Sequence, residues 1–537
     1  MLRKLTLPNL LQMVSIFFLP TIVILMITRK FITMRNQKTK KLPPGPKPWP
    51  FVGSLPEMLL SNKPPFAWIH KLMEEMKTEI ACIRFGNVHV IPVCSPELAC
   101  LFLKEQDSVF ASRPICMSAT LVSSGYLTSA FAPLGDQWAK MRRVLASYVL
   151  SPTSIQWLRP KRDEEADHLL RFIYNQCIDQ SLLPRVINMR KVTRYYSVNV
   201  LNNMIFSKRF LVDKDENEEQ VDSIFTLLNY YHSFGISDYL PWLSHFDLDG
   251  RKAGIKKTLA KASKYSDYEV DRRIQLWKDG KTNVEEDILD VLIMLKDTNG
   301  EPLLSDKEIK AQIVELMLAT VDNLSNIVEW TMRELLTQPK IMQMAMKEIN
   351  TVVGSNRLVQ ESDLPHLNYV KATIKETFRL HPLAAFNMPH VSVNDAIVGE
   401  YFIPKGSVLL LSRLGIGRNP RVWDDPLKFK PERHLLDGGE VAFTDSSYVC
   451  LSFSIGRRGC PGAKLGSTVI TMLLARLLQG FTWSLPPNSP QTTDFLACDS
   501  SCDKPLFARA NRDYPRTYIL NINGSFPRHV IHLFKIM

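Results

Sequence analysis

The sequence predicts a mainly α-helical fold with small β-sheets and a transmembrane helix at the N-terminus. A capping box of Ser305 and Glu308 starts a long run of apolar residues at helical spacing, which predicts a helix that crosses the core. An alternating segment that breaks at Gly86 and Asn87 predicts a β-hairpin. Residues 10–27 carry no charge and are about long enough to span a bilayer.

The N-terminal segment predicts a retained anchor. The alternative, a cleaved signal peptide, has its positive charges before the apolar run and a small-residue cleavage site after it. Here the basic residues follow the run, in "TRKFITMRNQKTKK". Positive charges favour the cytoplasmic side of a membrane, so the rest of the chain is expected there. We therefore expect residues 1–41 to form a membrane anchor with a basic flank.

The segment after the anchor is rich in proline. Residues 42–50 read "LPPGPKPWP", and proline at this density is incompatible with a helix or an inner strand. We interpret the segment as a stiff hinge that leads into one large domain at residues 51–510. A divergent C-terminal tail occupies residues 511–537.

The composition excludes several classes of function. Hydrophobic residues make up 45% of the 537 residues, so the chain can bury a large core. Nine scattered cysteines do not resemble a disulfide framework or a zinc site, and they indicate reduced thiols. The net charge is +12, but no basic stretch interleaves with aromatic residues as a nucleic-acid groove requires. A membrane surface or an acidic protein partner fits this charge better.

One cysteine has the surroundings of a ligand. The stretch "SFSIGRRGCPGAKLG" places Cys460 among Gly456, Gly459 and Gly462, which let the backbone turn tightly and approach a flat ligand. An apolar helix follows, and its N-terminus favours a thiolate. Arg458 can neutralise a carboxylate of a bound cofactor. A thiolate in an apolar, partly positive pocket suits haem iron.

Five positions of this stretch match a known pattern. Phe453, Gly456, Arg458, Cys460 and Gly462 agree with Phe-x-x-Gly-x-Arg-x-Cys-x-Gly, the haem-loop pattern that this chain shares with cytochromes P450. The chain thus resembles a microsomal cytochrome P450. The resemblance implies the cytochrome P450 fold and haem b, with Cys460 as the axial ligand of the iron and the other four residues in the haem site. A purely structural cysteine is the alternative.

Three further stretches extend the resemblance. "ETFRLHP" places Glu376 and Arg379 three residues apart on one helical face, and "FKPERH" supplies Arg433. In the family these three form a buried structural network behind the haem. "WAKMRR" places Trp138 and Arg142 where relatives hold a haem propionate.

The middle of the long helix departs from most of the family. Relatives have an acid followed by a threonine that relays protons to iron-bound oxygen. Here Asp322 is present, but Asn323 stands where threonine is expected, and an amide has no hydroxyl to pass on a proton. Thr320 lies one turn away and either orders a water or is simply a helix-lining polar residue.

This substitution occurs with other markers of one group. The Asp322–Asn323 pair, the ending "PERH" at His434 and the stretch "FNMPHVS" resemble the plant cytochromes P450 that N-hydroxylate amino acids twice to give aldoximes. Leu324 departs from the proline usual in that group. A carboxylate substrate in an apolar cavity needs a compensating donor. Arg113, Asn387 and His390 are the candidates, although His390 is equally well explained as a core histidine.

The resemblance also implies partners. Oxygen and an amino acid are the expected substrates, and NADPH supplies electrons only through an NADPH-cytochrome P450 reductase. The protein is expected in the endoplasmic reticulum membrane as a single-pass protein with a cytoplasmic catalytic domain, in contact with lipid and with no nucleic acid. Two alternatives stay open. One is a microsomal cytochrome P450 that C-hydroxylates a lipophilic plant metabolite, and the other is a non-catalytic haem or membrane protein.

Overall fold

The computed structural model describes residues 41–178, 186–211, 218–232, 234–435, 439–444, 447–487 and 504–512. The expected membrane segment at residues 10–27 and almost all of the C-terminal tail lie outside these ranges. Among the helices that the structure describes, none combines the length and the apolar character needed to cross a membrane.

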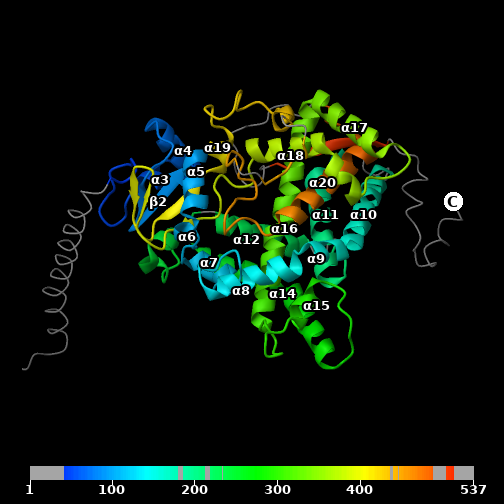
Figure 1. The fold of residues 1–537 in the computed structure, drawn as a ribbon, viewed down its shortest axis with the longest axis horizontal. Coiled ribbons are helices and arrows are strands. Elements are labelled where there is room, and N and C mark those ends of the chain that lie inside the picture. Colours follow the sequence, from blue (N-terminus) through cyan, green and yellow to red (C-terminus); the bar gives the residue numbers. More distant parts are fainter. Residues whose placement is uncertain are drawn as a thin grey trace, which may run out of the picture.

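Helices make up most of the described chain, and Figure 1 shows them filling the body of the molecule beside a smaller β-rich end. The long helices are α10 (Arg159–Ile178), α11 (Met189–Phe206), α12 (Glu218–His232), α14 (Arg251–Lys278), α16 (Asp306–Thr337), α17 (Pro339–Val353), α18 (Asn368–Leu380) and α20 (Ala463–Gly480). The shorter α-helices are α3 (Leu55–Leu60), α4 (Pro65–Glu75), α5 (Pro96–Cys100), α6 (Asp107–Phe110), α7 (Met117–Val122), α8 (Asp136–Val144), α9 (Pro152–Trp157), α13 (Ile236–Tyr239), α15 (Ile288–Met294) and α19 (Arg413–Gly417). Single turns of other helix types include η5 (Pro241–Leu243) and η7 (Pro431–His434).

The long helix α16 is the axis of the fold. Its predicted capping box is confirmed: Glu308 accepts the Ser305 N–H at 2.9 Å, and the Glu308 N–H donates to the Ser305 hydroxyl. The helix ends just before Pro339, as the sequence predicted. It contacts α11, α14, α18 and α20, so residues on several of its faces are buried. A rigid element of this kind can hold side chains at fixed positions in the middle of the protein.

The strands form three small sheets. The largest has the order β1-β2-β7-β4, and it is built from β1 (Ile83–Phe85), β2 (Val88–Val93), β7 (Val408–Leu411) and β4 (His390–Val391). The predicted hairpin is confirmed, because β1 and β2 pair antiparallel around Gly86, whose φ is +57°. A second sheet contains β3 (Val186–Asn188), β9 (Phe507–Arg512) and β8 (Phe481–Ser484), and a third pairs β5 (Ala396–Val398) with β6 (Tyr401–Ile403).

The parallel pairing of β2 with β7 joins segments that are far apart in the sequence. Val90 lies opposite Val408, and Val93 lies opposite Leu411. This pairing brings the N-terminal hairpin beside the segment of residues 383–393, which passes close to the cysteine loop before α20. The β-rich end therefore supplies one wall of the central cavity described below.

Candidate active site

The loop before α20 holds Cys460 in a tight turn. The Cys460 N–H donates to the Phe453 carbonyl at 2.8 Å, and the Gly459 N–H donates to the Gly456 carbonyl at 2.9 Å. Gly456 has a φ of +77°, and a Cβ at this position would lie 2.5 Å from the carbonyl oxygen of Leu103. Glycine is required here by both the backbone conformation and the close approach. The turn thus places Cys460 just before the first residue of α20.

Cys460 lies in a recess. The residue is exposed to solvent, yet the surrounding protein atoms desolvate its thiol, and this burial raises the pKa of the thiol. The Gly462 N–H and the positive charges of Arg142 and Arg413 lower the pKa but do not outweigh burial. The sequence predicted only that the N-terminus of the following helix favours the thiolate. The structure adds the desolvation, which opposes the thiolate, and a bound metal ion would favour the thiolate.

Arg458 is held by the backbone of two neighbouring segments. Its Nε donates to the Ala111 carbonyl at 2.6 Å, and its two terminal nitrogens donate to the carbonyls of Ser129 at 3.1 Å and Ala132 at 2.8 Å. The guanidinium group lies 4.6 Å from the centre of the Trp138 ring. This cation–π contact and the three hydrogen bonds fix the position of the charge.

Positive charges gather around Arg458. Burial and the neighbouring charges of Arg113 and Arg142 lower the pKa of Arg458 to about 9, and Glu315 and Asp107 oppose this shift only in part. Arg142 lies on α8, and burial lowers its pKa as well. Cations that repel one another in a buried site gain from an anionic ligand, because an opposite charge favours their ionised forms. The site therefore suits a ligand with carboxylate groups.

A buried ionic network lies between α18 and η7. Glu376 accepts two hydrogen bonds from Arg379, both at 2.8 Å, and one each from Arg433 at 3.0 Å and His434 at 2.9 Å. Burial alone would raise the pKa of Glu376, but its bonds to Arg379 and His434 hold the pKa at about 2. The structure thus brings together the three residues that the sequence analysis grouped, and it adds His434.

The three candidates in the middle of α16 have different surroundings. Asp322 is buried and accepts a hydrogen bond from the Asn326 amide at 2.9 Å, and burial raises the pKa of its carboxyl to about 6. The Asn323 amide donates to the carbonyl of Ala319 in its own helix at 2.7 Å. Thr320 is half-buried. Asn323 is therefore anchored to the helix backbone by its amide nitrogen.

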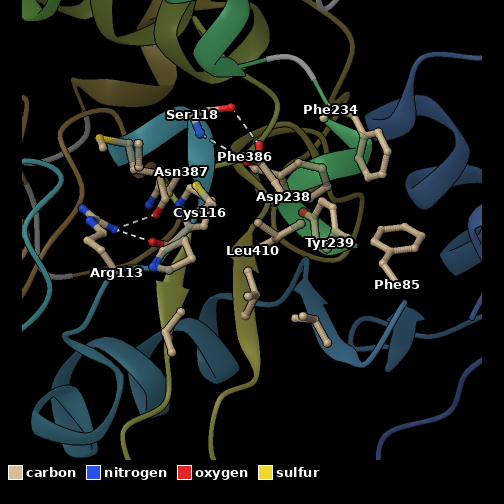
Figure 2. A pocket seen from close by; sticks show the side chains of 18 of the residues that line it. Phe85, Arg113, Cys116, Ser118, Phe234, Asp238, Tyr239, Phe386, Asn387 and Leu410 are labelled. Atoms are coloured by element: carbon tan, nitrogen blue, oxygen red, sulfur yellow. Dashed lines mark hydrogen bonds between the residues drawn. The ribbon is translucent and has the colours of Figure 1, made fainter. Parts of the chain in front are cut away.

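A cavity of about 1070 Å³ has two of the remaining candidates, Arg113 and Asn387, in its lining. It is lined by α4, α7, the α13 region, the β1–β2 hairpin and residues 383–393. Figure 2 shows Arg113 and Asn387 toward one end of the cavity and Phe85, Phe234 and Tyr239 toward the other. The volume lies just above the usual range of small-molecule sites, about 300–1,000 Å³.

Arg113 is fixed between two walls of this cavity. Its Nε donates to the Ala130 carbonyl at 3.0 Å, and one terminal nitrogen donates to the carbonyls of Met388 and Pro389 at 2.9 and 2.8 Å. These bonds hold the positive charge beside the cavity and tie the segment of residues 383–393 in place.

Asn387 and His390 differ in their access to the cavity. Asn387 lines the cavity, accepts a hydrogen bond from Arg413 and donates to the Ser454 hydroxyl at 3.2 Å, so it connects the cavity wall to the cysteine loop. His390 is not among the described residues that line the cavity. Its Nδ1 lies 2.9 Å from the Phe110 carbonyl, and burial together with nearby arginine charges lowers its pKa to about 3. His390 is therefore a neutral, buried histidine.

Known proteins resemble most of this chain. The family model for cytochrome P450 matches residues 43–503. The chain belongs to the cytochrome P450 family. A tryptophan N-monooxygenase of Prunus mume is 51% identical over 479 residues, which cover 87% of this chain and 90% of that relative. A phenylalanine N-monooxygenase of Arabidopsis thaliana is 50% identical and covers 91% and 96% of the two chains, and a tyrosine N-monooxygenase of Sorghum bicolor is 48% identical and covers 83% and 81%.

The cysteine recess of this cytochrome P450 fits haem. The family binds haem through a cysteine thiolate, and haem brings two propionate carboxylates with the iron. Cys460 is accessible at a glycine turn that allows a flat ligand to approach. The buried guanidinium group of Arg458 and the half-buried one of Arg142 form a positive site of the kind that carboxylates require, with the charge of Arg113 nearby. Donor chemistry and charge therefore agree with the group that the family implies.

Several residues of the site were missed by sequence reasoning. The motif ending "PERH" pointed to His434 as a group marker, and its position directly after Arg433 could have placed it in the Glu376 network. Arg413 gave no local signal, because its partners Asn387 and Cys460 come from other parts of the chain. Phe85, Phe234 and Tyr239 of the cavity come from the β1–β2 hairpin and the α13 region, which no motif connects.

Proposed function

We propose that this cytochrome P450 is an amino-acid N-monooxygenase that converts its substrate to an aldoxime. One observation carries the proposal: relatives that are about half identical over most of their length are named N-monooxygenases of amino acids. The Asp322–Asn323 pair supports the same group. The named substrates of these relatives include tryptophan, phenylalanine and tyrosine. Relatives with about the same identity to this chain are therefore named for amino acids with different side chains. The amino acid used by this chain is therefore set by a small part of the sequence.

The cysteine recess is the proposed haem b site. When bound there, haem activates molecular oxygen for insertion into the substrate. Cys460 is the proposed axial ligand, held by a turn in which Phe453, Gly456 and Gly462 set the backbone. The remaining proposed contacts are charge-assisted bonds to the propionates from Arg142 and Arg458, with Trp138 packed against Arg458.

The residues of α16 are proposed to handle protons. Asp322 is positioned by Asn326 inside the helix bundle, and a carboxyl whose pKa is about 6 can both accept and release a proton near neutral pH. Asn323 has no proton to relay, and we propose that its amide oxygen orients the substrate amine or a water. Thr320 is a second proposed position for an ordered water.

The substrate carboxylate needs a positive partner. Arg113 is the proposed source of that charge, because its guanidinium is buried and fixed at the wall of the cavity. Asn387 is proposed to orient the substrate at the junction of cavity and cysteine loop. His390 was a third candidate, and its neutral, buried environment favours the alternative of a core histidine that is hydrogen-bonded to the Phe110 carbonyl.

The location and partners are part of the same proposal. We propose an endoplasmic reticulum protein with an anchor and basic flank at residues 1–41, a hinge at 42–50, a cytoplasmic catalytic domain at 51–510 and a tail at 511–537. Electrons come from NADPH through a cytochrome P450 reductase that docks on basic surface. The membrane lipid binds the anchor.

Reconstitution tests the function. The full chain, a plant cytochrome P450 reductase and NADPH are supplied with each protein amino acid and with chain-elongated analogues, and products are analysed for aldoximes by mass spectrometry. We expect aldoxime from one amino acid or a small set. Hydroxylation of a terpene or phenolic compound without aldoxime from any amino acid would instead establish C-hydroxylation. If the reduced protein with carbon monoxide lacks the absorption band of other cytochromes P450, this result would indicate a non-catalytic protein.

A further inference from the structure

The far end of the cavity contains a carboxylate. Asp238 lines the cavity, and it is the acid among the charged side chains of the described lining residues, the others being Arg113 and Lys405. In Figure 2, Asp238 lies near Tyr239 and Phe234, away from Arg113. Asn387 donates to Ser454 of the cysteine loop, and Figure 2 shows Asp238 on the side of Asn387 that faces Tyr239. None of the roles proposed above uses this carboxylate.

Asp238 is held in position by α7. One carboxylate oxygen accepts the Ser118 N–H at 3.2 Å, and the other accepts the Ser118 hydroxyl at 2.9 Å. Arg251 donates its Nε to the same hydroxyl at 3.0 Å. A Cβ at Gly235 would lie 2.9 Å both from the Asp238 carboxylate and from the Arg251 Nε, so a side chain at this position would displace one of these groups. The carboxylate is thus oriented before any ligand arrives.

Three aromatic rings line the same cavity as this carboxylate. Phe234 stacks on Tyr239 with the ring centres 4.9 Å apart, and Phe85 meets the edges of both rings at 5.7 and 5.3 Å. An anionic oxygen beside aromatic rings is the chemistry that recognises an organic ammonium ion. The positive charge of Arg251 lies behind Ser118 and reduces the negative potential of Asp238 without removing its hydrogen-bond acceptors.

The cavity is larger than a single amino acid requires. At about 1070 Å³ it exceeds the common range of small-molecule sites, so one bound amino acid fills only part of it. The acid and Arg113 lie in different parts of the cavity, so the ammonium group and the carboxylate of an amino acid each meet an opposite charge at a different position of the substrate. An amino acid whose ammonium group is at Asp238 has its nitrogen away from Cys460. This end therefore serves capture and selection of the substrate, before the substrate moves to the cysteine end for oxidation.

We propose that Asp238, with Phe85, Phe234 and Tyr239, forms an ammonium subsite that captures the amino-acid substrate at the far end of the cavity. The proposal rests on the proposed function and adds a residue that selects zwitterions over acids without an amine. Capture at this subsite raises the local substrate concentration, so its loss acts on the apparent affinity and on KM more than on kcat.

The test compares two ligands in wild type and in Asp238→Asn. The variant keeps the shape of the side chain and an acceptor for Ser118, but it removes the charge. Isothermal calorimetry on the haem-loaded protein measures the affinity for the amino acid that the reconstitution identifies and for the corresponding carboxylic acid, which lacks the amine. We expect the variant to bind the amino acid about tenfold more weakly, as for a lost hydrogen bond between charged groups, and the acid with unchanged affinity. KM should rise by the same factor.

Two further variants separate recognition from structure. Phe234→Leu keeps an apolar side chain but removes a ring, and we expect a loss of about threefold for the amino acid alone. Asp247→Asn is the matched control: Asp247 accepts backbone N–H groups of Lys252 and Ala253 at the start of α14 and is not among the described lining residues of the cavity. It should change the affinity of neither ligand.

Three outcomes are informative. Equal weakening of both ligands in Asp238→Asn, or no change for either, overturns the ammonium subsite and leaves Asp238 as a tether of α7. An amino acid that binds wild type and responds to Asp238→Asn, with no aldoxime formed, supports the subsite and overturns the proposed function. Wild type that binds no amino acid overturns both.

Discussion

Cys460 is subject to opposing influences, and their balance determines what a substitution does. Burial disfavours its thiolate, whereas the N-terminus of α20 and the charges of Arg142 and Arg413 favour it. A serine at this position would have a much less acidic hydroxyl in the same desolvated recess and would supply no thiolate. The chemistry of the site therefore depends on sulfur rather than on the shape of the loop.

Cys460→Ser should abolish both turnover and the thiolate-type reduced carbon monoxide spectrum. The glycine turn and α20 remain, so the circular dichroism of the helices should change little. The measurement compares the reduced carbon monoxide spectra of purified wild type and variant at equal protein concentration. Cys450→Ser is a suitable control, since Cys450 is buried and hydrogen-bonded to Ser452 outside the turn. A normal spectrum from Cys460→Ser would disprove the assignment of the ligand.

Asp322 predicts a pH dependence of activity. Its pKa of about 6 means that the carboxylate is ionised at pH 7.5 and protonated below pH 6. We expect product per NADPH in wild type to fall as the pH drops through 6. Asp322→Asn should lower the rate about a hundredfold and remove this step, because a neutral amide cannot exchange protons. Steady-state product and peroxide yields between pH 5.5 and 8 give both profiles.

The same group predicts a change in stability. A carboxyl with a raised folded-state pKa favours folding below its unfolded pKa, and this contribution is lost as the pH rises through the folded value. Asp322→Asn should therefore raise Tm at pH 7.5 and have little effect at pH 4, where Asp322 is protonated in the folded state. Thermal unfolding at the two pH values tests this. A variant that is less stable at pH 7.5 would show that the ionised Asp322 is stabilising.

At the scale of elements, the network between α18 and η7 links the helical core to the segment after α19. Arg379 also donates to the carbonyls of Pro426 and Lys428, so its removal strands Glu376 and several backbone acceptors together. A buried ion pair that loses one partner costs about 3–5 kcal/mol. We expect Arg379→Ala to lose haem-loaded protein rather than only slow the reaction.

Haem content per protein and urea unfolding measure that loss. Arg421→Ala is the matched control, because Arg421 pairs with Glu79 and Glu97 at an exposed site. An exposed ion pair contributes about 0–1 kcal/mol, so the control should keep its haem. Arg379→Ala with full haem occupancy and normal unfolding would argue against a structural role for the network.

The elements that depend on local patterns could be predicted from the sequence, whereas those that depend on long-range contacts could not. The capping box of α16, the β1–β2 hairpin and the spacing of Glu376 and Arg379 are local, so propensity and periodicity were sufficient to predict them. The β2–β7 pairing and the cavity join segments hundreds of residues apart, and no local pattern encodes them. Desolvation of the Cys460 thiol was missed for the same reason, because it depends on neighbours from other elements. For His390 the sequence left a core position open as an alternative, and its buried environment agrees with that alternative.

At the scale of the whole molecule, exposed apolar side chains gather at the β-rich end. Leu60 is 82% exposed, Phe246 is 70% exposed and Trp242 is 65% exposed. They flank one apolar cluster in which α3 packs with the residues around α13 and η5. Large apolar side chains clustered on one face of a soluble domain indicate contact with a membrane or a protein. This face adjoins residues 41–48, which lead from the expected anchor and contact the domain through the Pro44 carbonyl.

We therefore predict that the protein keeps a second, weaker membrane contact when residues 1–30 are removed. The truncated protein should still bind vesicles of phosphatidylcholine and phosphatidylserine in a flotation assay, because each apolar side chain buried in lipid contributes about 1.5–3 kcal/mol. Adding Leu60→Glu and Trp242→Glu should weaken binding at least tenfold without loss of haem. Met344→Glu is the control, since Met344 is also exposed but lies on α17, away from the β-rich end (Figure 1). If the truncated protein stays free of vesicles, or if Met344→Glu releases it equally, the apolar face has no specific role in membrane binding.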